Sequence, residues 1–197
     1  IRDQSAKRTL AGGRVIDPFS SARGRAKPER LEILNALETN SSIKALLNLL
    51  KLLPSGLNFS SFIRAWNLTP EESLAIETSA VIVKIKTEDA VTFFAPNHFD
   101  QISVSILNVL RGWHEDNPEK PGPSSDILRK LLSIRLVKGV FRGILKILVS
   151  DEKIIYSGSG FCLPGFESKL NGKDEILWKK IRPLLEKDKF QPPVVHA

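Results

Sequence analysis

The chain has few of the residues that build catalytic and metal sites. It holds a single cysteine, Cys162, and three histidines, at positions 98, 114 and 196. One cysteine excludes an intramolecular disulfide and suits a reducing compartment. The histidines lie far apart, and Cys162 has no neighbouring ligand at metal spacing, so the sequence predicts no metal site. Since no catalytic set of residues occurs either, we expect these 197 residues to have no enzymatic activity of their own.

Other absences narrow the class of protein. No apolar run approaches the roughly 18 residues of a membrane span, and no segment has the pattern of a secretory signal. The phosphate-loop pattern Gly-x-x-x-x-Gly-Lys-Ser/Thr is absent. Methionine is also absent and the chain begins at Ile1, which we interpret as a segment of a longer protein. We expect a soluble, cytoplasmic, monomeric chain that contacts no membrane and holds no cofactor.

Positive charge is concentrated near the N-terminus. The formal net charge is +7, and residues 1–30 hold eight basic side chains against three acidic ones. A basic end fits a phosphate-rich partner, because each neutralised phosphate releases condensed counterions. The alternative is a flexible, solvated linker whose charges serve solubility. Arg23, Arg25 and Lys27 are the candidate nucleic-acid contacts in this segment.

The hydrophobic pattern predicts the same order of elements twice. In the first copy we expect helices over about 28–38 and 40–53, over Asn58–Trp66 and from Thr69, then strands over Ala80–Lys86 and Ala90–Phe94. In the second copy we expect helices over about His98–Glu115, from Ser124 or Ser125, and over about Leu136–Val149, then strands over Lys153–Tyr156 and Gly160–Leu163. An amphipathic helix over Asp174–Lys187 follows. Helix, short helix, helix, strand, turn, strand is the winged-helix order, and a period of about 60–70 residues indicates an array of small domains.

Apolar spacing also predicts the cores. A single buried stripe is expected from Ile43, Leu46, Leu47, Leu50 and Leu53. The aromatic residues Phe59, Phe62 and Trp66 share one helical face and are expected in the core rather than as a base-stacking platform. Cys162 lies in an apolar run and is expected to be a buried thiol. His114, beside two acids, is expected at the surface or at a helix end rather than as a ligand.

The best candidate binding surface is the helix expected over about Leu136–Val149. Basic residues recur there at intervals of three, four and four, which places them on one helical face. They are Arg135, Lys138, Arg142 and Lys146. A winged helix usually presents this helix to nucleic acid, where basic side chains contact phosphates and fix the register. The alternative is a solvated face that covers the hydrophobic side chains beneath it.

The corresponding helix of the first copy has the opposite charge. It holds Glu71, Glu72 and Glu77, and carboxylates repel phosphate. We therefore expect the first copy to be structural, since a fold alone does not make a nucleic-acid binder.

Several stretches resemble known translation factors. Residues 1–17, IRDQSAKRTLAGGRVID, resemble the closing strands of the last β-barrel in elongation factor Tu and its relatives. The following DPFSSARGRAKPERL resembles the barrel-to-arm junction of the bacterial selenocysteine-specific elongation factors, the SelB family. WHEDNPEKPGP, from Trp113, is similar to the FHxxNPxxPG element of that family, and QPPVV, from Gln191, is similar to the entrance of its third winged helix.

The resemblance implies a fold and a domain map. The fold class is mainly α with small β wings, as tandem winged-helix modules in an elongated arm. The map places barrel strands at 1–17, a basic linker at 18–30, winged helix 1 at 31–96, winged helix 2 at 97–167 and the beginning of winged helix 3 at 168–197.

A function follows from the same resemblance. The chain would be an arm segment of a GTP-dependent elongation factor that delivers selenocysteinyl-tRNA to the ribosome at recoded UGA codons. It would link the tRNA-carrying body to the module that binds an mRNA hairpin. The parent protein would be a GTPase that uses GTP and magnesium, and the partners would be the ribosome, RNA and, through other domains, selenocysteinyl-tRNA.

Two other functions stay open. A winged-helix transcriptional regulator would bind duplex DNA in a sequence-dependent way, although the acidic helix of the first copy and the barrel-like N-terminus disfavour it. A protein-interaction scaffold would show no salt-dependent RNA binding.

Overall fold

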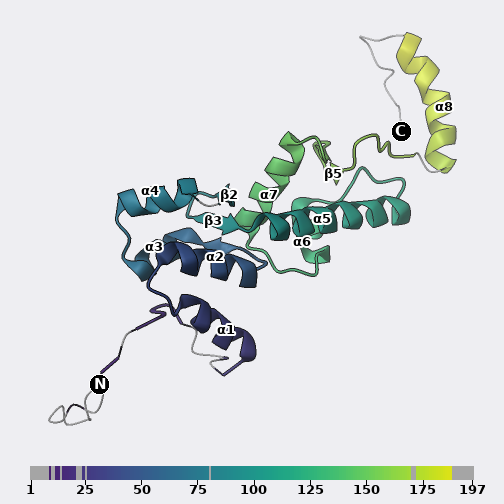
Figure 1. Cartoon of the computed structure of the whole chain (residues 1–197). Helices are drawn as coiled ribbons and strands as arrows, with labels where there is room; N and C mark the ends of the chain where they lie inside the picture. Colours follow the sequence, from purple (N-terminus) through teal and green to yellow (C-terminus); the bar gives the residue numbers. More distant parts are fainter. Residues whose placement is uncertain are drawn as a thin grey trace. The chain divides into compact units, whose positions relative to one another are not determined.

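A computed structural model describes residues 9, 12–13, 15–20, 24, 26–79, 81–169 and 172–187 (Figure 1). The contacts divide the chain into two compact units, Ile1–Val104 with Ser133–Ile144, and Ser105–Leu132 with Leu145–Ala197. The strands expected at residues 1–17 lie largely outside the described residues, as do Arg23 and Arg25.

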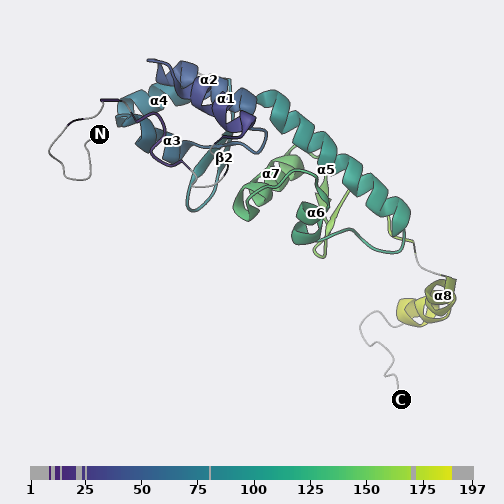
Figure 2. The same ribbon diagram turned by 90° about the horizontal axis from the view of Figure 1, so that it is seen from below.

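The first unit contains a helical layer and a small antiparallel sheet. Its elements are α1 (Pro28–Leu37), α2 (Ser42–Leu52), β1 (Leu57–Asn58), α3 (Phe59–Trp66), α4 (Pro70–Ser79), β2 (Val83–Lys86) and β3 (Val91–Phe94). The sheet has the order β1-β3-β2, and the helices α2, α3 and α4 gather around it (Figure 2). This is the winged-helix order. The two-residue strand β1 was not predicted, since a strand that short has no periodicity to read.

Side-chain caps explain where these helices begin. The Asn58 side chain accepts a hydrogen bond of 2.9 Å from Ser61 N–H at the start of α3. At α4, Thr69 Oγ1 accepts from Glu72 N–H while a Glu72 carboxylate oxygen accepts from Thr69 N–H, at 3.3 and 2.8 Å. That reciprocal pair is a capping box, which satisfies two backbone donors of the first turn. The starts predicted for both helices are thereby confirmed.

The core of the first unit is built from three aromatic rings and the inner faces of α1 and α2. Phe59 and Phe93 stack at 4.0 Å between ring centroids. The prediction that Phe59, Phe62 and Trp66 belong to the core is confirmed for the two buried phenylalanines, while Trp66 is half-buried and packs against the core. The stripe predicted for α2 is partly wrong. Ile43 and Leu47 are 39% and 40% exposed, whereas the buried side chains are Ala45, Leu46, Leu49 and Leu50. The small Ala45 lies on the inner face, where α1 packs closely on α2.

After β3 the same order recurs along the chain, in α5 (Pro96–Asp116), α6 (Ser125–Leu131), α7 (Lys138–Ser150), β4 (Ile155–Tyr156) and β5 (Phe161–Cys162), followed by α8 (Gly172–Lys187). The starts of α5 and α7 belong to the first unit, and the second unit contains the rest of these elements. Ser124 caps α6, and Cys162 is buried as predicted. The segment before α6 lies against the last strand, because Phe161 N–H donates to Pro123 O at 3.0 Å.

One glycine recurs at the same place in both copies. Gly56 precedes β1 with φ +84°, and Gly122 precedes Pro123 with φ +145°. Each lies against the last strand of its own wing: a Cβ on Gly56 would approach Phe94 Cζ to 2.6 Å, and one on Gly122 would approach the Phe161 carbonyl carbon to 2.8 Å. A positive φ favours glycine. The two positions share this sign and the closeness to a wing strand, although Gly56 meets a side chain and Gly122 meets a backbone carbonyl.

The expected fold class is confirmed for the part of the chain that the structure describes. Eight helices and two small antiparallel sheets are present there, in the order of winged-helix modules. Two details differ from expectation. Helix α7 begins at Lys138 rather than near Leu136. Helix α8 forms as predicted, but Ile176 and Leu177 on it are exposed, so its apolar residues do not form a core among the described residues.

Candidate nucleic-acid interface

Helix α7 carries the basic surface that the sequence predicts. The side chains of Lys138, Arg142 and Lys146 are all exposed, and their spacing of four residues places them along one edge of the helix. Five apolar residues on the other side of the helix are buried: Val140, Phe141, Ile144, Leu145 and Leu148. Lys138 and Arg142 lie in the first unit and Lys146 in the second, so the first two are the pair whose surroundings can be described together.

Arg135 does not lie on this helical edge. It is exposed but precedes α7, which begins at Lys138. The helix starts late because Leu136, at 3% exposure, is drawn into the core before the first turn. The first backbone bond of the helix runs from Phe141 N–H to Val137 O at 2.9 Å. Arg135 therefore lies in the loop before α7. The basic face was predicted to contain four residues and contains three, Lys138, Arg142 and Lys146.

The local charge is positive because acids are absent from the sequence around α7. Residues 127–150 hold six basic side chains and no acidic one. Within the first unit, the nearest strand end adds the exposed Lys86 but also the exposed acids Glu88 and Asp89. The electrostatic potential around Lys138 and Arg142 is therefore positive. Glu88 and Asp89, in the turn after β2, add negative charge beside it.

The adjacent face of α7 is made of glycine, a feature that the sequence reasoning missed. Gly139 and Gly143 are four residues apart, which places them on one side of the helix. A Cβ at Gly139 would lie 3.4 Å from Thr87 Cγ2, and a Cβ at Gly143 would fall well inside the contact distance of Ile85 Cγ2. Strand β2 and the residue after it thus lie directly on this face. The spacing Gly-x-x-x-Gly is visible in the sequence and could have indicated close packing.

The acidic residues of α4 have structural partners. Glu72 belongs to the capping box described above. Glu77 forms an ion pair with Lys84, with 3.2 Å between Glu77 Oε2 and Lys84 Nζ. Glu71 is fully exposed, and hydrogen bonds from its own backbone N–H and from Thr69 lower its pKa. A helix that carries a stable negative charge at its start is a poor surface for phosphate. The expectation of a structural role for this helix remains a prediction.

The basic N-terminal candidates are described only in part. Lys27 is exposed and precedes the first turn of α1. Nearby, Arg30 forms an ion pair of 2.6 Å with Asp17, and Arg64 lies over the ring of Phe19 at 5.3 Å. These contacts attach residues 17–19 to the first unit, so this stretch of the expected linker is ordered on the helices.

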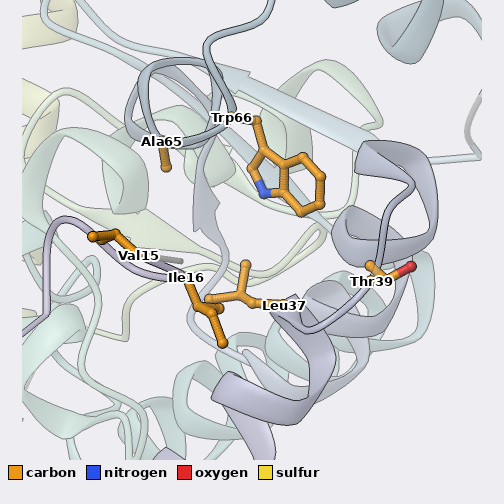
Figure 3. A pocket seen from close by; sticks show the side chains of 6 residues that line it. All are labelled: Val15, Ile16, Leu37, Thr39, Ala65 and Trp66. Atoms are coloured by element: carbon orange, nitrogen blue, oxygen red, sulfur yellow. The ribbon is translucent and has the colours of Figure 1, made fainter. Parts of the chain in front are cut away.

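A small pocket of about 160 Å³ lies beside this attachment (Figure 3). It is lined by Val15, Ile16, Leu37, Thr39, Ala65 and Trp66. Its side chains are apolar apart from the Thr39 hydroxyl and the Trp66 indole nitrogen, but more of its exposed lining is polar than apolar. No titratable side chain lines it.

His114 is a second residue whose role was missed. It is buried, its ring stacks on Phe166 at 3.6 Å between centroids, and its Nε2 accepts a hydrogen bond of 3.2 Å from Leu163 N–H. Because Nε2 accepts, the proton of the neutral ring is on Nδ1. Burial lowers the pKa of this imidazole. The expectation of a helix-end position was right, but a surface position was wrong, because the segment after β5 covers the ring.

The described ranges contain neither a candidate metal site nor a candidate membrane span. Nowhere in them do three or more His, Cys, Asp or Glu side chains gather as they would around a metal ion. Among the described helices, none has the length and apolar character to cross a membrane.

Comparison with known proteins gives one relevant similarity. No model of a known protein family matches the chain. Over 186 residues, which are 93% of this chain, it is 27% identical to the selenocysteine-specific elongation factor of Escherichia coli (strain K12). The matched region is 29% of the length of that protein. The chain is therefore distantly similar to one segment of a selenocysteine-specific elongation factor.

Proposed function

We propose that the chain is an arm segment of a GTP-dependent elongation factor that delivers selenocysteinyl-tRNA to the ribosome at recoded UGA codons. The observation that carries the proposal is the similarity to the Escherichia coli factor, which extends over 93% of the chain. In this proposal, GTP and magnesium are bound by another domain of the parent protein. In the same proposal, the segment itself performs no chemistry.

The proposed domain map has two complete winged-helix copies, at 31–96 and 97–167. Barrel strands at 1–17 and a basic linker at 18–30 precede them, and a third copy begins at 168. The glycines Gly56, between α2 and α3, and Gly122, between α5 and α6, support this division, because both have a positive φ. In this map, α7 belongs to the second copy and contributes its first turns to the compact unit of the first.

The segment contacts RNA, ribosomal or messenger, through the basic edge of α7. Support comes from exposed Lys138 and Arg142 in a stretch without acids. Basic side chains on a helix edge bind phosphates and release counterions, so they supply affinity without reading sequence. Arg135, Lys146 and the N-terminal Arg23, Arg25 and Lys27 are further proposed contacts.

Neutralising the edge tests this contact. The double variant Lys138→Gln/Arg142→Gln is expected to weaken binding to an RNA hairpin about tenfold at low salt and to flatten the salt dependence of log K by about 1.4–1.8. Fluorescence anisotropy across a salt series measures both quantities. The matched control Lys44→Gln/Lys51→Gln removes two exposed charges from α2 and is expected to change the affinity less than twofold. Equal effects of the two double variants would show that only net charge matters and would refute a specific edge.

The arrangement of α7 disfavours the transcriptional-regulator alternative. A DNA-reading helix inserts into the major groove and contacts base edges there. The glycine face of α7 lies against Ile85 and Thr87, which leaves a narrow exposed edge. Tight, sequence-dependent binding to duplex DNA would restore that alternative.

A further inference from the structure

The contact between α7 and β2 limits how the helix can meet RNA. Gly139 and Gly143 form one face of α7. Thr87 lies at van der Waals distance from a Cβ built on Gly139, and Ile85 lies closer than that to a Cβ built on Gly143. Ile85 is only 2% exposed, so the strand is tightly held at this point. Figure 1 shows α7 beginning next to β2 and β3.

The covered face and the basic edge are neighbours on the helix. Lys138 directly precedes Gly139, and Arg142 directly precedes Gly143, so each basic residue is about 100° around the helix from a covered glycine. A helix reads base edges when it enters the major groove of B-DNA, whereas the major groove of A-form RNA is too deep and narrow for side chains to read. With β2 in place, α7 offers only the side that holds Lys138 and Arg142.

We infer that α7 meets RNA edge-on, through phosphate groups alone, with strand β2 remaining docked on its glycine face. This inference rests on the RNA contact proposed above and specifies its mode. Strand β2 then lies beside the RNA-contacting surface, and it does not have to move away for RNA to bind. The helix can fix the position of an RNA backbone, and it cannot read the bases.

The turn after β2 is acidic. Thr87, which contacts Gly139, is followed by exposed Glu88 and Asp89. Two carboxylates beside a phosphate-binding edge repel the ligand. If β2 stays docked during binding, the variant Glu88→Gln/Asp89→Asn is expected to bind the RNA hairpin about threefold more tightly at low salt. If β2 moves away, this variant is expected to bind like the wild type.

A disulfide can lock the contact for a direct test. A Cβ at Gly139 would lie 3.6 Å from Thr87 Cβ, which is within the range of natural disulfides. The experiment uses Thr87→Cys/Gly139→Cys in a Cys162→Ala background, so that no other thiol is present. Closure is followed by free-thiol titration, with Lys44→Cys/Gly139→Cys as a control pair that is expected to stay reduced.

The RNA affinities of the locked and reduced forms then decide the inference. We expect the oxidised protein to bind a scrambled RNA hairpin within about twofold of the reduced protein, since edge-on binding needs no opening. A loss of tenfold or more on oxidation would overturn the inference, because it would mean that β2 has to leave α7. Failure of the pair to oxidise in a folded protein would overturn the contact itself. If the reduced protein and the wild type both bind no RNA, the proposed function fails first, and this inference fails with it.

Hydrogen exchange of the wild-type chain gives the same answer without any substitution. Edge-on binding predicts that the backbone amides of β2 exchange no faster when the RNA hairpin is bound. Faster exchange of Ile85 and Lys86 in the complex would contradict the inference.

Discussion

Replacing Gly122 by alanine is expected to destabilise the second unit by about 3–5 kcal/mol. Two costs add. The backbone at Gly122 has φ +145°, which strains any other residue. The new Cβ would also overlap the carbonyl group of Phe161, and neither backbone segment can yield, since Phe161 N–H is bonded to Pro123 O.

The matched control is Gly112→Ala on α5 in the same unit. Nothing lies within 4 Å of a Cβ at Gly112, and glycine inside a helix costs about 0.5–1 kcal/mol relative to alanine. This variant is therefore expected to be slightly more stable than the wild type. Urea denaturation followed by circular dichroism compares the three proteins. A Gly122→Ala protein as stable as the wild type would contradict the close approach of these two segments.

Replacing His114 by alanine is expected to lower the free energy of unfolding by about 2–4 kcal/mol. The variant loses the stack on Phe166 and leaves Leu163 N–H without its acceptor in a partly buried place. The segment from Leu163 to Lys169 is held to the end of α5 by these contacts and by the bond from Lys169 N–H to Pro118 O at 2.8 Å. Urea denaturation measures the loss, and faster proteolysis of this segment is expected as well.

The same residue makes stability depend on pH. Because burial lowers the pKa of His114 in the folded state, the folded protein binds a proton less readily than the unfolded chain. Stability is then complete above the unfolded value of about 6.5 and falls as the pH decreases through the folded-state pKa. His114→Gln keeps an acceptor near the position of Nε2 and does not titrate, so this variant should lose the part of the dependence that lies below pH 6.5. An unchanged profile in His114→Gln would contradict the assignment to this ring.

The helices of this chain were predictable because their signals are local. Thr69 was expected to begin α4, and it forms a capping box with Glu72. The helix expected from Asn58 also forms, with the Asn58 side chain as its cap. Wing strands β2 and β3 follow from β-branched and aromatic runs. The strand β1 did not follow, because its two residues pair with β3 only through the tertiary fold.

Burial was harder to predict than secondary structure. Which side of α2 faces inward depends on α1, a neighbour that periodicity does not reveal, so Ala45 replaced Ile43 in the core. His114 looked polar and exposed because its sequence neighbours are acids, whereas its environment is set by Phe166, fifty-two residues later.

The spacing of basic residues in α7 predicted the basic surface, but it did not predict the glycine face beside that surface. Lys138, Arg142 and Lys146 are exposed as expected. Arg135 fell outside the helix because burial of Leu136 delays its start. The docking of β2 on Gly139 and Gly143 joins residues more than fifty positions apart. The spacing of the two glycines could have indicated close packing, but a single sequence does not show which strand packs there.

The most direct test of the account is the binding of this chain to three nucleic acids across a salt series: a selenocysteine-insertion hairpin, a scrambled hairpin and duplex DNA. The account predicts weak and steeply salt-dependent binding that is equal for the two RNA hairpins, because phosphates alone are contacted. Strong preference for one RNA sequence, or tight sequence-dependent binding to the DNA, would contradict it. Absence of binding to any of the three at low salt would also contradict it, and would leave α7 as a packing helix with a solvated edge.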